Sequence, residues 1–445
     1  MTTPICDFVK AYAASKVLRL HMPGHKGQAL LGAEPMDLTE IAGADSLYEA
    51  DGIIAESEAN ASLLFGCPTF YSTEGSSQCI RAMLYLLQQH AKELGTEPLI
   101  LAGRNAHKSF LGGAALLDIP VTWLYGEVPS YLSCAINEEI LERALSEMPK
   151  KPTAVYLTAP DYLGNTVDWD GISAVCHRHG VLLAVDCAHG AYLRFLSPSM
   201  HPMDHGVDLC CASAHKTLPV LTGGAYLHVS KSAPNAFSEQ AKNALALFGS
   251  TSPSYLILQS IDAANAYCAG DYPRRLAETV LALDGLKQRM AAHGYTTVKS
   301  DPLKLTVFAK PYGYTGTELA QLLRAHGMEC EFSDPDYLVL MLTPQNALSD
   351  IDRLWAVFRA ILRHPPITDA PPAPTASETV LSPRDAMLAP ARRVPTASSA
   401  GCIAASPTVG CPPAIPIVLC GERITDSAIR ALHYYGIDSL WIVNT

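Results

Sequence analysis

Short apolar runs alternate with helix-length amphipathic segments through the first half of the 445-residue chain. This alternation is typical of an α/β protein with a mainly parallel sheet, because parallel neighbours need a long crossover that a helix usually provides. The clearest helical pattern follows Ser77, where Ile80, Met83, Leu84 and Leu87 recur at i, i+3, i+4 and i+7. We expect seven strands in one sheet, over residues 69–72, 98–102, 121–125, 154–158, 181–185, 207–212 and 225–229.

Two residues with catalytic potential follow two of these predicted strands. Lys216 lies in a polar turn between the strands 207–212 and 225–229, and Asp186 directly follows the strand 181–185. A lysine beside a buried strand end is desolvated, which lowers its pKa and leaves the amine free to attack a carbonyl. An enzyme that uses pyridoxal phosphate needs such a lysine for the Schiff base and an aspartate that keeps the pyridine nitrogen protonated. Taken singly, each residue also fits a plainer interpretation, a surface lysine and a strand-end acid that never meet.

Several motifs, taken together and in order, resemble the Orn/Lys/Arg decarboxylase family, whose members are pyridoxal phosphate enzymes of the aspartate aminotransferase fold. The central matches are Ser213-Ala-His215-Lys216-Thr217-Leu218 and Asp186-Cys-Ala-His189-Gly190. Further matches lie along nearly the whole chain: His21-Met-Pro-Gly-His-Lys-Gly27, Gly75-Ser-Ser77, Asn105-Ala-His107-Lys108-Ser109, Thr251-Ser-Pro-Ser-Tyr255 and Leu381-Ser-Pro-Arg-Asp-Ala386. No flavodoxin-like N-terminal wing is visible, so the chain resembles the shorter members of that family.

The resemblance implies an aspartate aminotransferase-like fold (PLP fold type I), with a mainly parallel seven-stranded sheet in a large domain and a small α+β domain. We expect an N-terminal segment and large cofactor-binding domain over residues 1–270 and the small domain over 271–364. The stretch 365–380 is rich in proline and predicts a linker. A family-type C-terminal segment would occupy 381–445.

Gly75-Ser-Ser77 stands where a helix should begin, and a helix N-terminus offers free N–H groups and a positive dipole to an anion. From spacing alone, a plain serine N-cap is the better explanation. The resemblance reverses that preference, because this turn aligns with the family's phosphate-binding loop. Glu74 stands where the family has an uncharged residue, so we expect its carboxylate to turn away.

The resemblance also implies roles for individual residues. Lys216, His215, Asp186 and His107 would be catalytic, with Lys216 or His215 returning a proton to the substrate and His107 stacking on the cofactor ring. The cofactor-binding set would comprise Gly75, Ser76, Ser77, His107, Asp186, His189, Ser213 and Lys216. We expect no metal ligands, because the two histidines of His21-Met-Pro-Gly-His25 cannot align on a helix that Pro-Gly forbids.

The family reaction is decarboxylation of a basic L-amino acid, arginine, lysine or ornithine, to an amine that feeds polyamine synthesis. A cationic side chain needs a carboxylate or carbonyls at the far end of its pocket. Glu329, Glu331, Asp334 and Asp336 form an acidic stretch, which by itself predicts a solvated loop. The family's Tyr-Pro-Pro-Gly is replaced here by Cys411-Pro-Pro-Ala414, which leaves the substrate open.

Two alternatives stay open at this point. One is another pyridoxal phosphate reaction on the same fold, transamination or a lyase reaction such as β-elimination. Aminotransferases usually hold the α-carboxylate with a small-domain arginine, and the sequence singles out none, which favours decarboxylation. The other is a catalytically silent paralogue kept as a binding or regulatory subunit, against which the intact set of Asp186, His107 and Lys216 argues.

Composition excludes several other classes. A net charge of −11 and the absence of a basic run argue against nucleic-acid binding. No apolar run approaches the ~20 residues of a membrane span, and the first twenty residues lack the apolar core of a signal peptide. Thirteen scattered cysteines without Cys-x-x-Cys spacing predict reduced thiols and a cytoplasmic protein. From the resemblance we expect a homodimer or a higher homo-oligomer.

Overall fold

The computed structural model describes residues 1–127, 130–298, 301–373, 376–407 and 414–444. The chain forms two compact units. The first comprises Met1–Glu97, Thr153–Val155 and Cys176–Arg275, and the second comprises Pro98–Pro152, Tyr156–Val175 and Leu276–Thr445. The domain bounds expected at residues 270, 364 and 380 remain a prediction. Among the described residues, no helix is both long enough and apolar enough to cross a bilayer.

The largest sheet has the seven strands that the apolar runs predict, in the order β1-β7-β6-β5-β4-β2-β3. β5 and β6 are parallel, as are β2 and β3, whereas β7 runs antiparallel to both β1 and β6. The reversal at β7 follows from its short connection to β6, which holds one brief helix instead of a full crossover. The strands are β1 Thr69–Ser72, β2 Ile100–Gly103, β3 Val121–Leu124, β4 Ala154–Thr158, β5 Leu182–Asp186, β6 Leu209–Ala212 and β7 Ala225–Val229.

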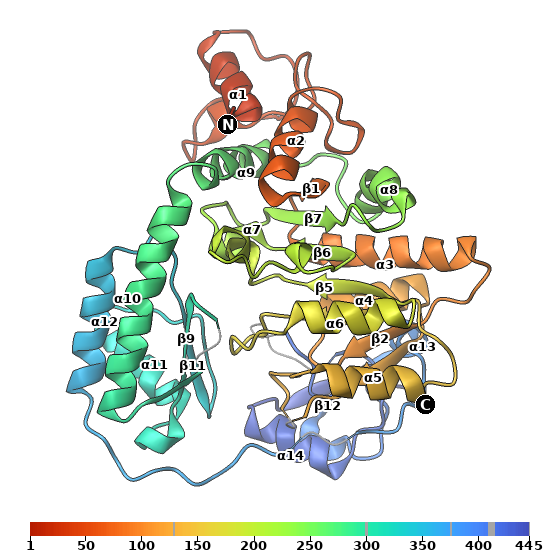
Figure 1. The fold of residues 1–445 in the computed structure, drawn as a ribbon, viewed down its shortest axis with the longest axis vertical. Helices are drawn as coiled ribbons and strands as arrows, with labels where there is room; N and C mark the ends of the chain where they lie inside the picture. The colour runs from red at the N-terminus through yellow and green to blue at the C-terminus, as the bar shows by residue number, and fades with distance from the viewer. Residues whose placement is uncertain (128–129, 299–300, 374–375, 408–413, 445) are drawn as a thin grey trace. The chain divides into compact units, whose positions relative to one another are not determined.

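Helix α3, residues Ser76–Glu93, positions the first unit's candidate site. Its buried face includes Ile80, Met83, Leu84 and Leu87, the residues whose spacing predicts the helix. This face packs on β6 and β7 (Figure 1). The hydrogen bonds of Gly75 and Ser76 hold the start of the helix beside the end of β6 and the beginning of β7. The other helices with residues in this unit alone are α1 Pro4–Ala14, α2 Ile53–Phe65, α7 Ala214–Thr217, α8 Asn235–Ala246 and α9 Tyr255–Cys268, with the 3-10 turns η1 Glu34–Met36, η2 Leu47–Glu49, η3 Ala191–Phe195 and η4 Pro202–Asp204.

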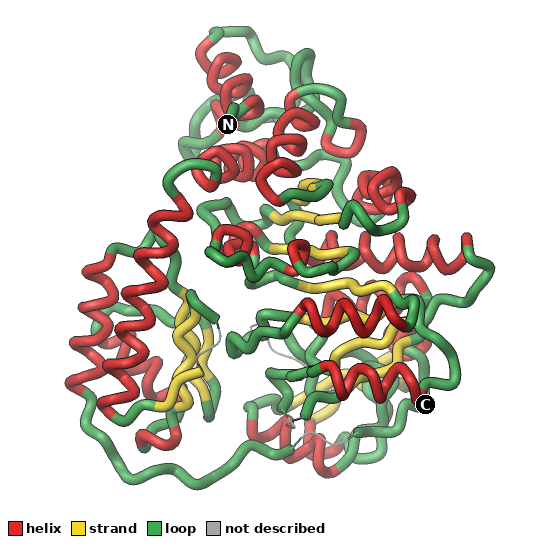
Figure 2. The backbone as a smooth tube through the Cα atoms, viewed as in Figure 1, coloured by secondary structure: helices red, strands yellow, loops and turns green. Residues whose placement is uncertain are grey.

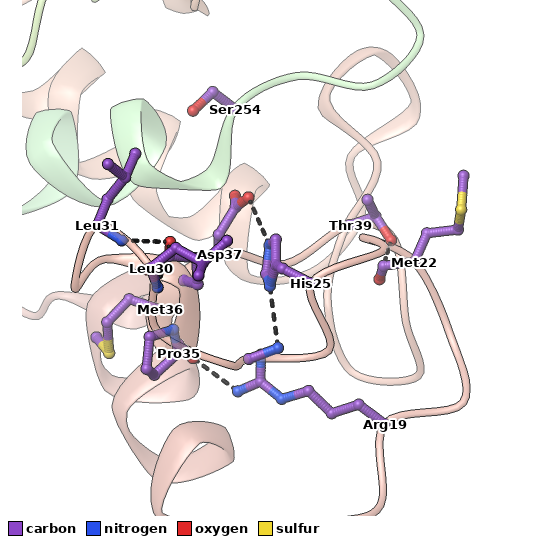
Figure 3. A network of polar contacts seen from close by, with 12 residues as sticks. Arg19, Met22, His25, Leu30, Leu31, Pro35, Met36, Asp37, Thr39 and Ser254 are labelled. Carbon is purple, nitrogen blue, oxygen red and sulfur yellow. Dashed lines mark hydrogen bonds and ion pairs between the residues drawn. The ribbon is translucent and has the colours of Figure 1, made fainter.

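The apolar positions Phe8, Tyr12 and Val17 predict a short amphipathic helix over residues 7–20, and the segment after α1 departs from it. The helix ends at Ala14, and Lys16 adopts a left-handed backbone with φ of 56°. The loop that follows is tied together by polar contacts (Figure 3). The guanidinium of Arg19 donates to the carbonyl of Pro35 at 2.6 Å, and His25 lies 3.2 Å from the carboxylate of Asp37.

The second unit contains a four-stranded antiparallel sheet in the order β10-β11-β9-β8. Helices α10, α11 and α12 lie along one side of this sheet (Figures 1 and 2), and their apolar faces form a common core with β9 and β11. These elements are α10 Tyr272–His293, which belongs to this unit from Leu276 on, α11 Gly316–Ala325, α12 Leu348–Ala360, β8 Thr296–Val298, β9 Lys304–Phe308, β10 Phe332–Ser333 and β11 Tyr337–Met341, with the 3-10 turn η5 Lys310–Tyr312.

The chain's last part adds a two-stranded antiparallel sheet, β12 Ala391–Pro395 with β13 Ser439–Val443. Helix α14, Asp426–Tyr434, packs Ala431 and Leu432 into a core with Val394 and Leu440 of this sheet. The pattern of the sequence does not predict this pairing, because its two strands are distant along the chain. The remaining helices are α4 Lys108–Leu117, α5 Glu138–Glu147, α6 Trp169–Arg178 and α13 Pro383–Leu388, with the turn η6 Thr396–Ser398.

Candidate active site

A cluster of polar groups lies at the start of α3 in the first unit. Gly75 precedes the helix with φ of 73° and ψ of 177°, a conformation that only glycine adopts without strain. Its N–H donates to the carbonyl of Gly223 at 2.7 Å, which fixes the turn against the connection into β7. The hydroxyl of Ser213, at the end of β6, donates to that of Ser76 at 2.8 Å. Ser77 completes the first turn of the helix.

The acid that precedes this polar cluster, Glu74, is held away from the start of α3. Glu74 is exposed, and its carboxylate accepts the N–H of Ser250 at 2.5 Å. This bond keeps the negative charge of Glu74 on the loop before α9, where it does not occupy the helix N-terminus. The start of α3 therefore presents hydroxyl and N–H donors, which suit an anion.

Lys216 and His189 lie in contact. Nζ of Lys216 is 3.0 Å from Nε2 of His189, and the lysine side chain is half-buried in the short helix α7. The predicted loop at this position is thus one turn of helix, in which the N–H of Lys216 donates to the carbonyl of Ser213 at 3.1 Å. Since β5 and β6 are parallel neighbours, the residues that follow them meet at the same edge of the sheet.

Asp186 ends β5 and is almost fully buried, with 2% of its surface exposed. Its Oδ1 accepts the N–H of Ala188 at 3.1 Å and lies 3.7 Å from Sγ of Cys211 on β6. A buried carboxylate with its own donors can face a cationic ring nitrogen at low cost. Cys211 was not among the residues predicted for the site. The only indication in the sequence is that Cys211 lies on the predicted strand 207–212, which is the next strand after Asp186.

His215 has a defined orientation. Its Nδ1 lies 3.0 Å from the carbonyl oxygen of Gly224, which can only accept, so Nδ1 carries the proton of this bond. Burial lowers the pKa of His215 below its usual value, and the adjacent charge of Lys216 acts in the same direction. The ring is therefore neutral at pH 7, with Nε2 as its unprotonated nitrogen.

His107 belongs to the second unit, where it caps α4. Its Nδ1 accepts the N–H of Ser109 at 3.1 Å, and its ring is half-buried. The loop around it is joined to the C-terminal segment, because the N–H of Lys108 donates to the carbonyl of Ala414 at 3.0 Å. Arg104 donates to the carbonyls of Pro416 and Ile417 at 2.8 and 2.9 Å.

Sequence patterns did not predict this attachment of the loop. Arg104 also lies 3.7 Å from the carboxylate of Glu422, and both side chains are largely buried. The motif Cys411-Pro-Pro-Ala414 lies outside the described residues up to position 413. Its last residue, Ala414, has φ of 60°, the left-handed conformation that glycine occupies most easily.

The acidic stretch of the second unit is only partly the solvated loop that was expected. Glu329 is exposed and pairs with Arg324 at 2.8 Å, and Glu331 accepts the hydroxyl of Tyr162 at 2.8 Å. Asp334 and Asp336, by contrast, are buried, with 6% and 0% exposed. The expectation fails for these two because their side chains are buried in the unit, where Nζ of Lys310 lies 2.9 Å from Asp336 and compensates the charge of that carboxylate.

The residues of the first unit fit pyridoxal phosphate. The glycine at the helix start allows close approach of an anion, the hydroxyl donors of Ser76 and Ser213 face each other, and the amine of Lys216 sits against an imidazole. Asp186 supplies the buried acceptor. Among the described residues, no group of three or more His, Cys, Asp or Glu side chains is arranged to hold a metal ion.

The chain is similar to known decarboxylases over most of its length. Residues 3–299 match the family model described as "Orn/Lys/Arg decarboxylase, major domain". Two curated relatives are the arginine decarboxylases of Bacillus subtilis, 28% identical over 96% of this chain and 92% of the relative, and of Halalkalibacterium halodurans, 29% identical over 96% and 91%. The lysine decarboxylase of Francisella novicida superposes with a TM-score of 0.80 at 17% identity, covering 99% of this chain and 81% of that one. This structural likeness confirms the predicted fold class.

Proposed function

The chain belongs to the Orn/Lys/Arg decarboxylase family, and we propose that it removes the α-carboxyl group of a basic L-amino acid with pyridoxal phosphate as its cofactor. Membership of this family makes the chain an enzyme, a decarboxylase. The observation that carries the cofactor assignment is the 3.0 Å contact between Lys216 Nζ and His189 Nε2. It places an amine that can form a covalent bond beside a group that can take its proton.

Each part of the cofactor has a counterpart in the sequence. Ser76, Ser77 and Ser213, with the backbone before Ser76, would hold the phosphate at the N-terminus of α3. Asp186 would hold the ring nitrogen in its protonated form, and His107 would stack on the ring. When bound, pyridoxal phosphate supplies an electron sink for the electron pair left on Cα as CO2 departs.

The remaining steps fall to the chain's own groups. Nε2 of His189 accepts a proton from Lys216 Nζ, which leaves the amine nucleophilic. After CO2 departs, Cα needs a proton from a nearby acid. His215 is poorly suited to donate it, because its Nδ1 proton is engaged with Gly224 and its pKa is lowered by burial. We therefore assign this proton to Nζ of Lys216, which recovers it from Nε2 of His189 across the same 3.0 Å contact.

Arginine is the substrate we place first. The curated relatives in Bacillus subtilis and Halalkalibacterium halodurans are named arginine decarboxylases, whereas the solved structure in Francisella novicida is a lysine decarboxylase at lower identity. The amine formed would enter polyamine synthesis, in the cytoplasm. Lysine and ornithine are the competing substrates.

We also propose that the active protein is a homodimer or a multiple of one. Residues 17–31 expose an unusual number of large apolar side chains, with Leu20 exposed by 84%, Leu30 by 89% and Leu31 by 94%. Large apolar side chains that a chain leaves exposed are suited to burial against a second copy, and the contacts in Figure 3 hold the backbone of this segment in place. Sedimentation at micromolar concentration should give at least twice the chain mass of 47.7 kDa.

The activity is tested with protein loaded with pyridoxal phosphate and supplied separately with carboxyl-labelled arginine, lysine and ornithine. Released labelled CO2 identifies the substrate, and we expect the highest kcat/KM for arginine. Formation of a keto acid without CO2 would replace decarboxylation by transamination. A protein that takes up cofactor and turns over none of the three would contradict the proposal.

A further inference from the structure

Asp186 and Cys211 are directly paired residues of adjacent parallel strands. The register of β5 and β6 places the Cα atoms of these two residues opposite each other, and the N–H of Cys187 donates to the carbonyl of Cys211 at 2.9 Å. Paired residues of a sheet direct their side chains to the same face. This explains why Sγ of Cys211 comes within 3.7 Å of Oδ1 of Asp186.

The thiol is the donor in this contact. A carboxylate oxygen can only accept, and Cys211 is fully buried. Burial, followed by the nearby charge of Asp186, raises the pKa of Cys211 well above its usual value, so the sulfur keeps its proton at neutral pH. Oδ1 of Asp186 therefore accepts a hydrogen bond from the N–H of Ala188 and another from the thiol.

We propose that Cys211 is a positioning residue that fixes the carboxylate of Asp186 and sets how strongly it competes for the proton of the cofactor's ring nitrogen. This inference rests on the proposed function, in which Asp186 faces that nitrogen. Two donors on one oxygen fix the plane of the carboxylate. A donor also stabilises the ionised carboxylate, which makes it a weaker base and leaves the proton on the ring.

The neighbouring residue provides a matched control. Cys210 has the same side chain, is equally buried on the same strand, and points to the opposite face of the sheet. Its Sγ contacts the carbonyl of Cys211 and the side chain of Cys187. Truncation to alanine removes the same sulfur from both positions, so any cost common to Cys210→Ala and Cys211→Ala comes from packing.

The experiment compares Cys211→Ala, Cys211→Ser and Cys210→Ala with the unchanged protein. The first readout is the dissociation constant of pyridoxal phosphate from the apoprotein. The second is the 15N chemical shift of bound cofactor labelled at its ring nitrogen, which reports whether that nitrogen carries the proton. Thermal stability is recorded for all four proteins, so that a variant that does not fold is recognised.

Cys211→Ala should weaken cofactor binding by about five-fold, the worth of one hydrogen bond, and move the 15N signal toward that of an unprotonated pyridine. Cys211→Ser keeps a donor and should restore both readouts, and Cys210→Ala should match the unchanged protein in both. If Cys211→Ala and Cys210→Ala lower stability alike and leave the 15N signal in place, Cys211 has only a packing role and the inference is wrong. An unchanged protein that binds no pyridoxal phosphate would instead overturn the proposed function.

If Cys211→Ala does not fold, Cys211→Ser decides the question. A hydroxyl is a stronger hydrogen-bond donor than a thiol, so the serine variant should hold the 15N signal at or beyond the protonated position. A shift toward the unprotonated form in that variant would contradict the proposed role of the donor.

Discussion

Ser213 and Ser76 are joined by a 2.8 Å hydrogen bond between their hydroxyls, although 137 residues separate them along the chain. The bond links the end of β6 to the first turn of α3. Lys216 follows that strand end by one helical turn, and its N–H donates to the carbonyl of the same Ser213. Ser213 thus contributes both to the position of the Lys216 amine and to the arrangement of the donors at the start of α3.

Lys216→Ala should abolish decarboxylation, because the variant loses both the group that bonds to the cofactor and the proposed proton donor to Cα. We expect less than about a thousandth of the unchanged rate, since covalent and acid–base roles together exceed that factor. Labelled CO2 release at saturating cofactor measures the loss. Lys231→Ala, at an exposed lysine, is the control and should keep full activity. A Lys216→Ala protein with a few per cent of the rate would refute the assignment.

His201 should make the fold sensitive to acid. It is fully buried, and desolvation lowers its pKa from 6.5 to about 3. In the unfolded chain the ring takes up a proton below about pH 6.5, while the folded chain excludes it, so stability present above that pH is lost as the pH falls. The loss is about 1.4 kcal/mol for each pH unit between these values, or about 2 kcal/mol at pH 5.

The variant His201→Asn isolates this effect. Its amide oxygen can still accept the N–H of Met203, which His201 caps, but it does not titrate. The free energy of unfolding, measured with denaturant, falls between pH 7 and pH 5. We expect this fall to be about 2 kcal/mol smaller for the variant than for the unchanged protein. His433→Asn, at an exposed histidine, should leave the acid loss as it is. An equal loss in all three proteins would mean that His201 does not titrate on unfolding.

Asp334 makes the opposite contribution. Burial raises its pKa from 3.8 to about 6, and the charge of Asp336 adds to the shift. The folded chain therefore holds a proton that the unfolded chain releases, and stability falls as the pH rises from about 4 to about 6, by about 3 kcal/mol in all. Above pH 6 the whole penalty is present.

Asp334→Asn should relieve this penalty. The amide keeps an oxygen for the N–H groups of Asp336 and Tyr337, which now donate to Oδ1 at 2.7 and 2.6 Å. The NH2 group replaces Oδ2, which is buried without a hydrogen-bond partner, so the substitution breaks no hydrogen bond at that atom. We expect the free energy of unfolding to rise by about 1–3 kcal/mol at pH 8 and to change little at pH 4, measured by thermal unfolding at both pH values. An equal change in stability at pH 4 and pH 8 would show that the ionisation of the Asp334 carboxyl does not cause the effect.

Ala414 carries strain that a glycine would remove. Its φ of 60° costs an alanine about 1 kcal/mol, and the side chain is buried, so Ala414→Gly should stabilise the chain by up to about 1 kcal/mol. Ala404→Gly, at a buried alanine with ordinary φ, is the matched control and should destabilise by about 1 kcal/mol. Thermal midpoints compare the two. A loss of stability in both variants would show that the packing of the Cβ outweighs the strain.

The strands of the large sheet could be predicted because buried parallel strands are continuous apolar runs, and their ends then locate Asp186 and Lys216. The register between β5 and β6 could not be predicted. The sequence therefore does not show which of the two adjacent cysteines, Cys210 or Cys211, bonds to Asp186. The helix expected to reach Leu20 ends at Ala14, because Val17, Leu18 and Leu20 have no core of their own unit to enter and are exposed. Periodicity records which residues are apolar and not what covers them.

The attachment of Arg104 to Pro416 and Ile417 has a consequence for how the chain is made. These partners follow Arg104 by 312 and 313 residues, and synthesis proceeds from the N-terminus at about 5–20 residues per second. The carbonyls that receive the guanidinium therefore leave the ribosome tens of seconds after it does. Until then the loop that carries His107 lacks its anchor, so a nascent chain can complete its large sheet well before it can complete this loop.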